Sequence, residues 1–84
     1  MSALILLSKP DCHLCHEMKA VVSPILAELG LQLVERDVRA DPEDRRRWAL
    51  EIPVLLWNGT ELARHRTTAD EIRSRLAPLL RAEC

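Results

Sequence analysis

The chain has 84 residues, which suffices for one compact domain with a single hydrophobic core. Hydrophobic residues make up 48% of the sequence, so the composition argues against a disordered chain. The 12 basic and 13 acidic residues give a formal net charge of -1 at pH 7, which argues against a nucleic-acid-binding protein because such proteins carry a basic excess.

The first predicted element is a strand at residues 3–7, an apolar run without alternation that is typical of a strand covered on both faces. The run is far shorter than the ~20 residues of a membrane span, and it lacks the basic leader of a signal peptide. We therefore expect a cytoplasmic protein without a membrane partner. After a polar break, apolar residues recur at helical spacing over residues 13–29, and Gly30 ends this predicted helix.

The middle of the chain predicts a second strand and a short helix. Residues 31–38 alternate in part, as in a strand at the edge of a sheet. Asp41 is a typical N-cap and Pro42 a typical first helical residue, and Trp48 and Leu50 are expected to form the apolar side of this helix. The three arginines at 45–47 follow acidic residues, which is typical of a solvated helix surface.

The last third predicts a hairpin and a final helix. Pro53 opens an apolar strand at residues 54–57, and the dipeptide Asn58-Gly59 favours a tight turn into a strand at residues 60–66. Residues 68–71 have the spacing of a capping box. The helix that follows has an apolar stripe formed by Ile72, Leu76, Leu79 and Leu80.

This order of elements, βαβαββα, predicts an α/β fold with a four-stranded mixed sheet and helices on both faces. The two fully apolar strands belong in the centre of the sheet, and the two mixed strands belong at its edges. The first two strands are expected to be parallel through a right-handed crossover, and the last two to form a hairpin. No linker or internal repeat interrupts the sequence, so residues 1–84 are expected to form one domain.

Two cysteines, Cys12 and Cys15, lie where the first strand gives way to the long helix. Residues three apart on a helix face the same side, so the two sulfurs can meet across the first turn. Unpaired N–H groups and the helix dipole at this end favour a thiolate over a thiol. A close cysteine pair in a reducing compartment indicates redox chemistry or metal binding. Cys12 is the predicted nucleophile, and Cys15, one turn deeper, is the predicted resolving cysteine.

The cysteine pair, the order of elements and the run Ile52-Pro53-Val54 together resemble glutaredoxin. More closely, they resemble the small bacterial glutaredoxin-like proteins of the thioredoxin superfamily, over nearly the whole chain. The resemblance implies that Pro53 is a cis-proline beside the sulfurs. It also implies that Ile52, Pro53 and Val54 form the substrate-binding edge, on which an extended substrate or glutathione docks by strand addition. The alternative for Pro53 is a strand-opening residue that needs no N–H donor.

The sequence departs from the glutaredoxin pattern at two places. Glutaredoxins typically carry Pro and an aromatic residue between the cysteines, where this chain has His13 and Leu14. They also have Gly-Gly and an acidic residue before the last helix, where residues 63–68 of this chain read Ala-Arg-His-Arg-Thr-Thr. The N-terminus of that helix can still accept a carboxylate near Thr68. Glutathione therefore stays open as a cosubstrate, and no permanently bound cofactor is expected.

Two residues are candidates for tuning the Cys12 thiolate. His13 is either a cation or hydrogen-bond donor for the thiolate or an exposed residue of the first turn, and the sequence favours neither. Lys9 is a weaker candidate, because exposed charges are screened by salt. His65 is interpreted as a surface residue, and Cys84 as a free thiol at the chain end.

Other functions fit parts of the sequence. Residues 12–16 spell the haem-attachment pattern C-x-x-C-H, but a covalent haem requires export and a haem-sized pocket. A structural zinc site needs four ligands, and the chain has no second cysteine pair, so no metal ligand is assigned. Two alternatives stay open: a carrier of an iron–sulfur cluster bridged between two subunits, as in some glutaredoxins, and a non-catalytic adaptor with the same fold.

The sequence thus predicts an enzyme, a glutaredoxin-like thiol–disulfide oxidoreductase with a redox-active disulfide. Its expected roles are electron transport and cell redox homeostasis. Its expected partners are proteins that contain disulfides or mixed disulfides with glutathione, and the chain is expected to be a monomer.

Overall fold

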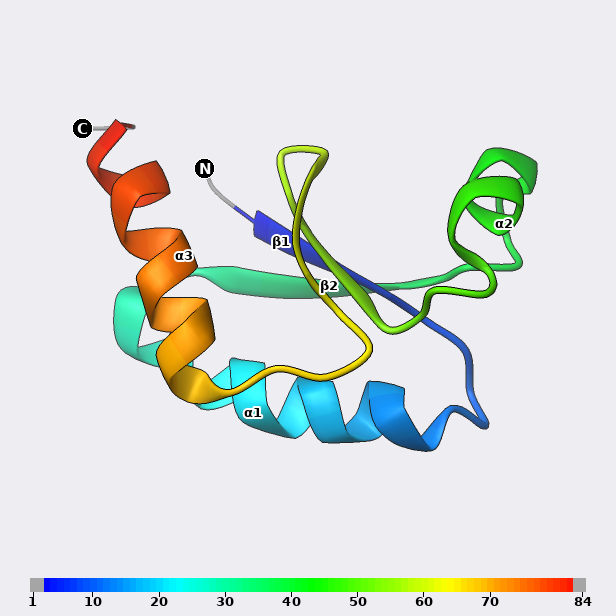
Figure 1. Cartoon of the computed structure of the whole chain (residues 1–84), viewed down its shortest axis with the longest axis horizontal. Helices are drawn as coiled ribbons and strands as arrows, with labels where there is room; N and C mark the ends of the chain where they lie inside the picture. The colour runs from blue at the N-terminus through cyan, green and yellow to red at the C-terminus, as the bar shows by residue number, and fades with distance from the viewer. Residues whose placement is uncertain (1–2, 83–84) are drawn as a thin grey trace.

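The computed structural model describes residues 3–82, so the predicted free thiol of Cys84 lies outside the described residues. The described part contains the elements in the predicted order (Figure 1). They are β1 (Ala3–Ser8), α1 (His13–Leu29), β2 (Gln32–Asp37), α2 (Pro42–Trp48), β3 (Val54–Trp57), β4 (Thr60–Arg64) and α3 (Ala69–Ala82). No helix among these residues is both long and apolar enough to cross a membrane.

The four strands form one mixed sheet in the order β2-β1-β3-β4. The pair β1–β2 is parallel, and the pairs β1–β3 and β3–β4 are antiparallel. The two fully apolar strands, β1 and β3, are central, which confirms the prediction from their composition. The register places Leu7 of β1 opposite Val54 of β3, so the carboxyl end of β1 meets the amino end of β3.

The larger hydrophobic cluster lies on one face of the sheet, under α1 and α3. It contains Leu4, Leu6, Met18, Val22, Ile25, Leu26, Leu55, Trp57, Leu62, Ala63, Ile72 and Leu76. An ion pair of 2.5 Å between Arg73 of α3 and Glu28 of α1 joins the two helices at the surface. Burial of each large apolar side chain in such a cluster contributes roughly 1.5–3 kcal/mol.

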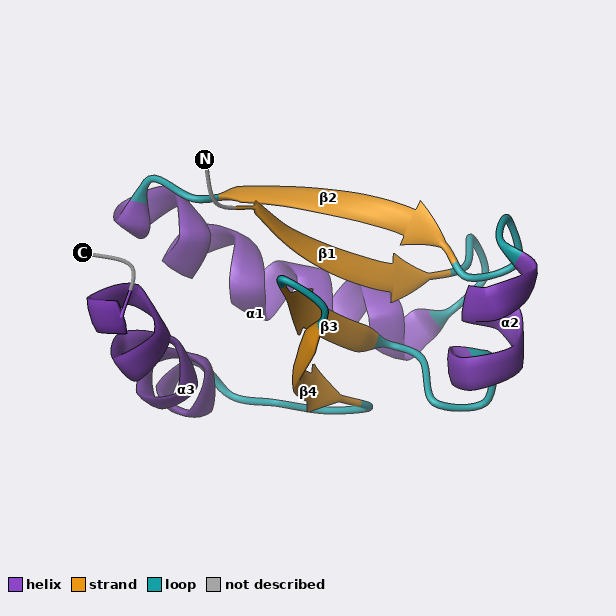
Figure 2. Cartoon of the chain, turned by 90° about the horizontal axis from the view of Figure 1, so that it is seen from above, coloured by secondary structure: helices purple, strands orange, loops and turns teal. Residues whose placement is uncertain are grey.

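The smaller cluster lies on the opposite face and consists of Leu7, Val54 and Leu56, with Ile5, Trp48 and Ile52 packed against it. Trp48 is the last residue of α2, so this helix contributes to the second face. Figure 2 shows α2 at the end of the sheet to which β1 and β2 point. The expectation of helices on both faces is confirmed. The second face is covered only in part, because the short helix α2 contributes Trp48 to the smaller cluster, whereas α1 and α3 together cover the larger one.

The short helix α2 begins as predicted but ends earlier. Asp41 caps it, with its carboxylate accepting the N–H groups of Glu43 and Asp44 at 2.8 and 3.4 Å. The prediction that Leu50 belongs to its apolar side is wrong, because Leu50 lies beyond the helix and is 94% exposed. The N–H of Glu51 donates to the carbonyl of Trp48 at 2.8 Å, and this turn takes the chain back to the sheet with Leu50 at its tip.

Candidate functional site

Cys12 is the N-cap of α1, with an extended backbone at φ -91° and ψ 107°. Its Sγ accepts the backbone N–H of Cys15 at 3.1 Å, and so satisfies one of the N–H groups that have no partner within the helix. The N–H of Cys12 donates to the carbonyl of Lys9 at 3.2 Å, in the turn that joins β1 to α1. The sulfur therefore lies at the positive end of the helix dipole, where the ionised form of a thiol is favoured.

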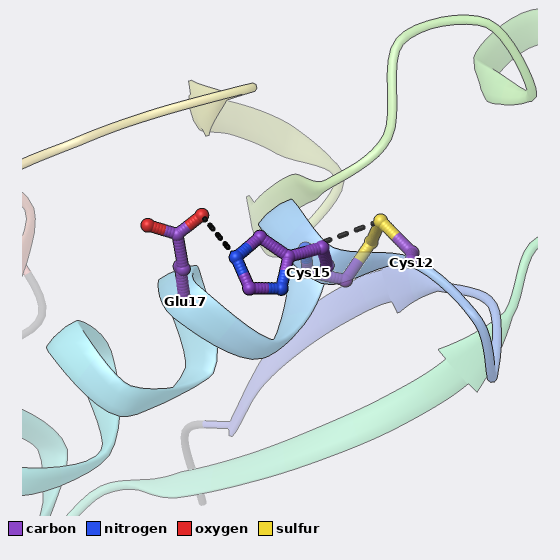
Figure 3. The surroundings of a disulfide bond; sticks show 4 residues. Cys12, Cys15 and Glu17 are labelled. Atoms are coloured by element: carbon purple, nitrogen blue, oxygen red, sulfur yellow. Dashed lines mark hydrogen bonds and ion pairs between the residues drawn. A yellow bond between two sulfur atoms is a disulfide. The ribbon is translucent and has the colours of Figure 1, made fainter.

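The two cysteines are joined by a disulfide, with their Cα atoms 5.2 Å apart (Figure 3). Cys15 is only 1% exposed, whereas Cys12 is of intermediate exposure. A molecule from solution can therefore approach Cys12 much more easily than Cys15. The prediction that the two sulfurs meet across the first turn is confirmed, and the roles of nucleophile and resolving cysteine stay predictions.

The two candidates for tuning the thiolate lie on the exposed side of the site. The side chain of His13 is 88% exposed, and its Nε2 lies 3.5 Å from a carboxylate oxygen of Glu17, one helical turn further along α1. The ion-pairing partner of His13 in this structure is thus Glu17. Lys9 is exposed and contributes its carbonyl to the turn before Cys12.

The Ile52–Pro53 peptide bond is cis, as the resemblance to glutaredoxin implied. Pro53 is fully buried and Ile52 is half-buried, and Val54 begins β3 with 0% exposure. Because Val54 pairs with Leu7 at the carboxyl end of β1, and the cysteine turn follows β1 directly, both segments lie at the same end of the sheet. The tertiary structure therefore brings the predicted docking residues and the disulfide to one end of the sheet.

Sequence reasoning missed a group of charged residues around the segment that contains Pro53. One carboxylate oxygen of Glu51 lies 3.0 Å from Nη1 of Arg64 and 3.0 Å from Nε2 of His65. Arg64 also makes two hydrogen bonds of 2.6 and 2.5 Å to Glu61. These bonds lower the pKa of the Glu61 carboxyl, and the Glu61 and Glu51 carboxylates together raise the pKa of the Arg64 guanidinium. No sequence signal could have shown the contact, because Arg64 and His65 lie 13 and 14 residues after Glu51 in the chain.

Two surface hollows flank the start of α1. One, of about 220 Å³, is lined by Ser8, Lys9, Pro10, His16, Glu35 and Asp37. The other, of about 150 Å³, is lined by Leu14, Glu17, Met18, Val21, His65, Arg66 and Thr67, so one of the two residues between the cysteines, Leu14, contributes to it. Among residues 3–82, no group of three or more His, Cys, Asp or Glu side chains is placed to hold a metal ion.

Comparison with solved structures shows that this is a thioredoxin-like fold. A malarial protein matches with a TM-score of 0.66 at 18% identity, over 93% of this chain and 96% of its own. A thioredoxin-2, described as a component of the malaria parasite protein secretion machinery, matches with a TM-score of 0.62 at 19% identity, over 98% and 82% of the two chains. The holo form of glutaredoxin C1 from Populus tremula x tremuloides matches with a TM-score of 0.53 at 17% identity, over 96% and 85%.

The sequence also matches the family described as glutaredoxin-like domain (DUF836) over residues 3–77. The chain therefore belongs to this glutaredoxin-like family, which confirms the resemblance drawn from the cysteine pair and the proline.

Proposed function

We propose that the protein is a thiol–disulfide oxidoreductase in which Cys12 is the nucleophile and Cys15 the resolving cysteine. One observation carries the proposal: the two cysteines are close enough to form a disulfide, and only the one at the helix N-terminus is open to a partner. The position of Cys12 favours its thiolate, and the thiolate is the form that attacks disulfides.

The proposed reaction transfers two electrons from the dithiol to a substrate disulfide. The Cys12 thiolate attacks one substrate sulfur and bonds to it, the substrate S–S bond breaks, and the other substrate sulfur leaves as a thiolate that takes up a proton. Cys15 then loses its proton and attacks the Cys12 sulfur of the mixed disulfide. The substrate sulfur that was bonded to Cys12 leaves and takes up a proton, and the Cys12–Cys15 disulfide remains. Burial of Cys15 suits this second step, because its target is the neighbouring sulfur of Cys12 rather than a sulfur in solution.

The backbone at Ile52 is the proposed docking edge for an extended substrate segment. The carbonyl of Pro53 already accepts the N–H of His65 at 2.8 Å, so Ile52 is the nearest residue before it that can pair with a substrate chain. Glutathione, either alone or joined to a protein in a mixed disulfide, is a proposed substrate or reductant. A cytoplasmic location is also proposed, because a reducing compartment returns the disulfide to the dithiol.

Redox equilibration in glutathione buffers, with the mass of the protein as readout, tests the proposal. We expect an intramolecular disulfide that forms and opens reversibly, and we expect Cys15→Ser to accumulate a mixed disulfide at Cys12. A Cys12 thiol that stays protonated and unreactive near neutral pH would contradict the proposal and favour the non-catalytic adaptor. A visible absorbance band in anaerobically purified protein would favour the cluster carrier instead.

A further inference from the structure

The strand β4 ends in an unusual backbone turn at His65. The N–H of Arg66 donates to the carbonyl of Arg64 at 2.7 Å, and the residue between them, His65, has φ 62°. A turn closed between residues two apart with positive φ at its centre is a rare and strained form. Residues other than glycine adopt this region only when neighbouring contacts hold them there, and such residues cluster at functional sites.

The contacts that hold this turn go to the segment that contains the cis-proline. The backbone N–H of His65 donates to the carbonyl of Pro53 at 2.8 Å. The imidazole of His65 and the guanidinium of Arg64 both bind the same carboxylate oxygen of Glu51, each at 3.0 Å. Arg64 and His65 therefore hold the segment at two points, one on each side of Ile52.

We propose that Arg64, His65 and Glu51 form a clamp that positions the Ile52 backbone for substrate docking. This inference rests on the proposed function, because it assigns a role in the same site. The Glu51 clamp consists of positioning residues: none of them is proposed to contact the reacting sulfurs. The clamp fixes the direction of the docking edge. The backbone next to a substrate cysteine can then pair with the backbone at Ile52 while the sulfur of that cysteine meets Cys12.

Exposure of the clamp indicates a role beyond stability. The side chains of Arg64, Glu51 and His65 are 42%, 36% and 51% exposed, and ion pairs at such sites contribute little to stability. The charged neighbours on the packed elements are Glu61, which also binds Arg64, and Glu17 and Arg66, which line the adjoining hollow. The ring of Trp48 lies 6.0 Å from the Arg64 guanidinium.

A pair of matched variants tests the clamp. Glu51→Gln removes the carboxylate that belongs to the docking segment, and Glu61→Gln removes the other carboxylate of Arg64, which does not touch that segment. The reduced proteins react with two neutral disulfides at one pH: the disulfide-linked dimer of acetyl-Ala-Cys-Ala-amide, which has peptide groups to dock, and bis(2-hydroxyethyl) disulfide, which has none. His65→Asn is a further variant, because Asn tolerates positive φ but cannot reproduce the imidazole contact.

We expect Glu51→Gln and His65→Asn to slow the reaction with the peptide disulfide about fivefold, which corresponds to about 1 kcal/mol, because the docking edge is no longer held in one direction. Their reaction with bis(2-hydroxyethyl) disulfide should change by less than about twofold, and Glu61→Gln should follow the wild type on both. Melting temperatures measured alongside identify a variant that is merely unfolded.

The outcomes separate the clamp from the proposed function. If the wild-type protein reacts with neither disulfide, the proposed function fails and the clamp has no role to play. If the wild type reacts with both, the clamp alone is overturned by any of three results. These are an equal loss on the two disulfides, an equal loss in Glu51→Gln and Glu61→Gln, and no loss in folded Glu51→Gln and His65→Asn.

Discussion

The two sides of the candidate site are assembled in different ways. The cysteine side is local: Cys12 and Cys15 are three residues apart, and the first turn of α1 alone sets their separation. The proline side is assembled from distant segments, because Pro53 and Glu51 are held by Arg64 and His65 from the end of β4. The comparison teaches that the reactive chemistry resides in a short motif, whereas the docking surface depends on tertiary contacts.

The largest expected effect is on the cysteine side. Replacing Cys12 with serine removes the attacking sulfur, so disulfide exchange should fall to the background rate. Replacing Cys15 leaves the attack intact but removes the second step, so mixed disulfides should build up instead. Mass spectrometry of both variants after exposure to a disulfide peptide measures this difference. Mixed disulfides that form on the Cys12→Ser variant would reverse the assigned roles.

The next effect concerns the two faces of the sheet, because the proline side rests on the smaller cluster. Leu55 and Leu56 are neighbours on β3 that face opposite clusters, and they are 0% and 6% exposed. We expect Leu55→Ala to lower the free energy of unfolding by about 4 kcal/mol and Leu56→Ala by about 2 kcal/mol. Urea unfolding measures both values. Equal losses would show that the small cluster supports the fold as strongly as the large one.

A smaller effect is expected from the docking segment itself. Pro53→Ala removes the ring that fixes φ and adds a backbone N–H that the present arrangement does not contain. We expect about tenfold slower exchange with a disulfide peptide, equivalent to about 1.4 kcal/mol. The loss of unfolding free energy, in kcal/mol, should be smaller than the loss in the exchange reaction. Parallel measurement of the exchange rate and of the unfolding free energy distinguishes a docking role from a role in stability. An equal loss in both would contradict a docking role.

The smallest effect lies at Asp37, which ends β2 beside the hollow next to Lys9. Hydrogen bonds from Arg39 lower the pKa of the Asp37 carboxyl from 3.8 to about 2. Because the pKa is lower in the folded state, the carboxylate stabilises the fold above pH 4, and this contribution is lost as the pH falls toward 2. The difference in stability between the wild type and Asp37→Asn should be small near neutral pH, because the pair is exposed, and should shrink as the pH falls through 2. Denaturation midpoints across this range measure it, and a difference that grows in acid would contradict the assignment.

Much of the fold could be predicted from the sequence, because short-range signals specify it. Unbroken apolar runs identified β1 and β3 as central strands, Asp41 and Pro42 marked the start of α2, and Asn58-Gly59 marked the hairpin turn. The predicted strand at residues 60–66 ends earlier, at Arg64, because His65 turns away with positive φ to contact the cis-proline segment. The predicted strand at residues 31–38 is likewise shortened by a residue at each end.

The sequence by itself determined the cysteine pair, its place at the start of a helix and the order of the elements, because each depends on residues within one turn or one strand. Only the tertiary structure decided the surroundings of Pro53: the exposure of Leu50, the turn at His65 and the shared carboxylate of Glu51. The turn at His65 and the shared carboxylate of Glu51 depend on the direction in which β4 returns along β3. A contact between charges 13 residues apart leaves no periodic pattern in a sequence. It therefore becomes visible only in the folded chain.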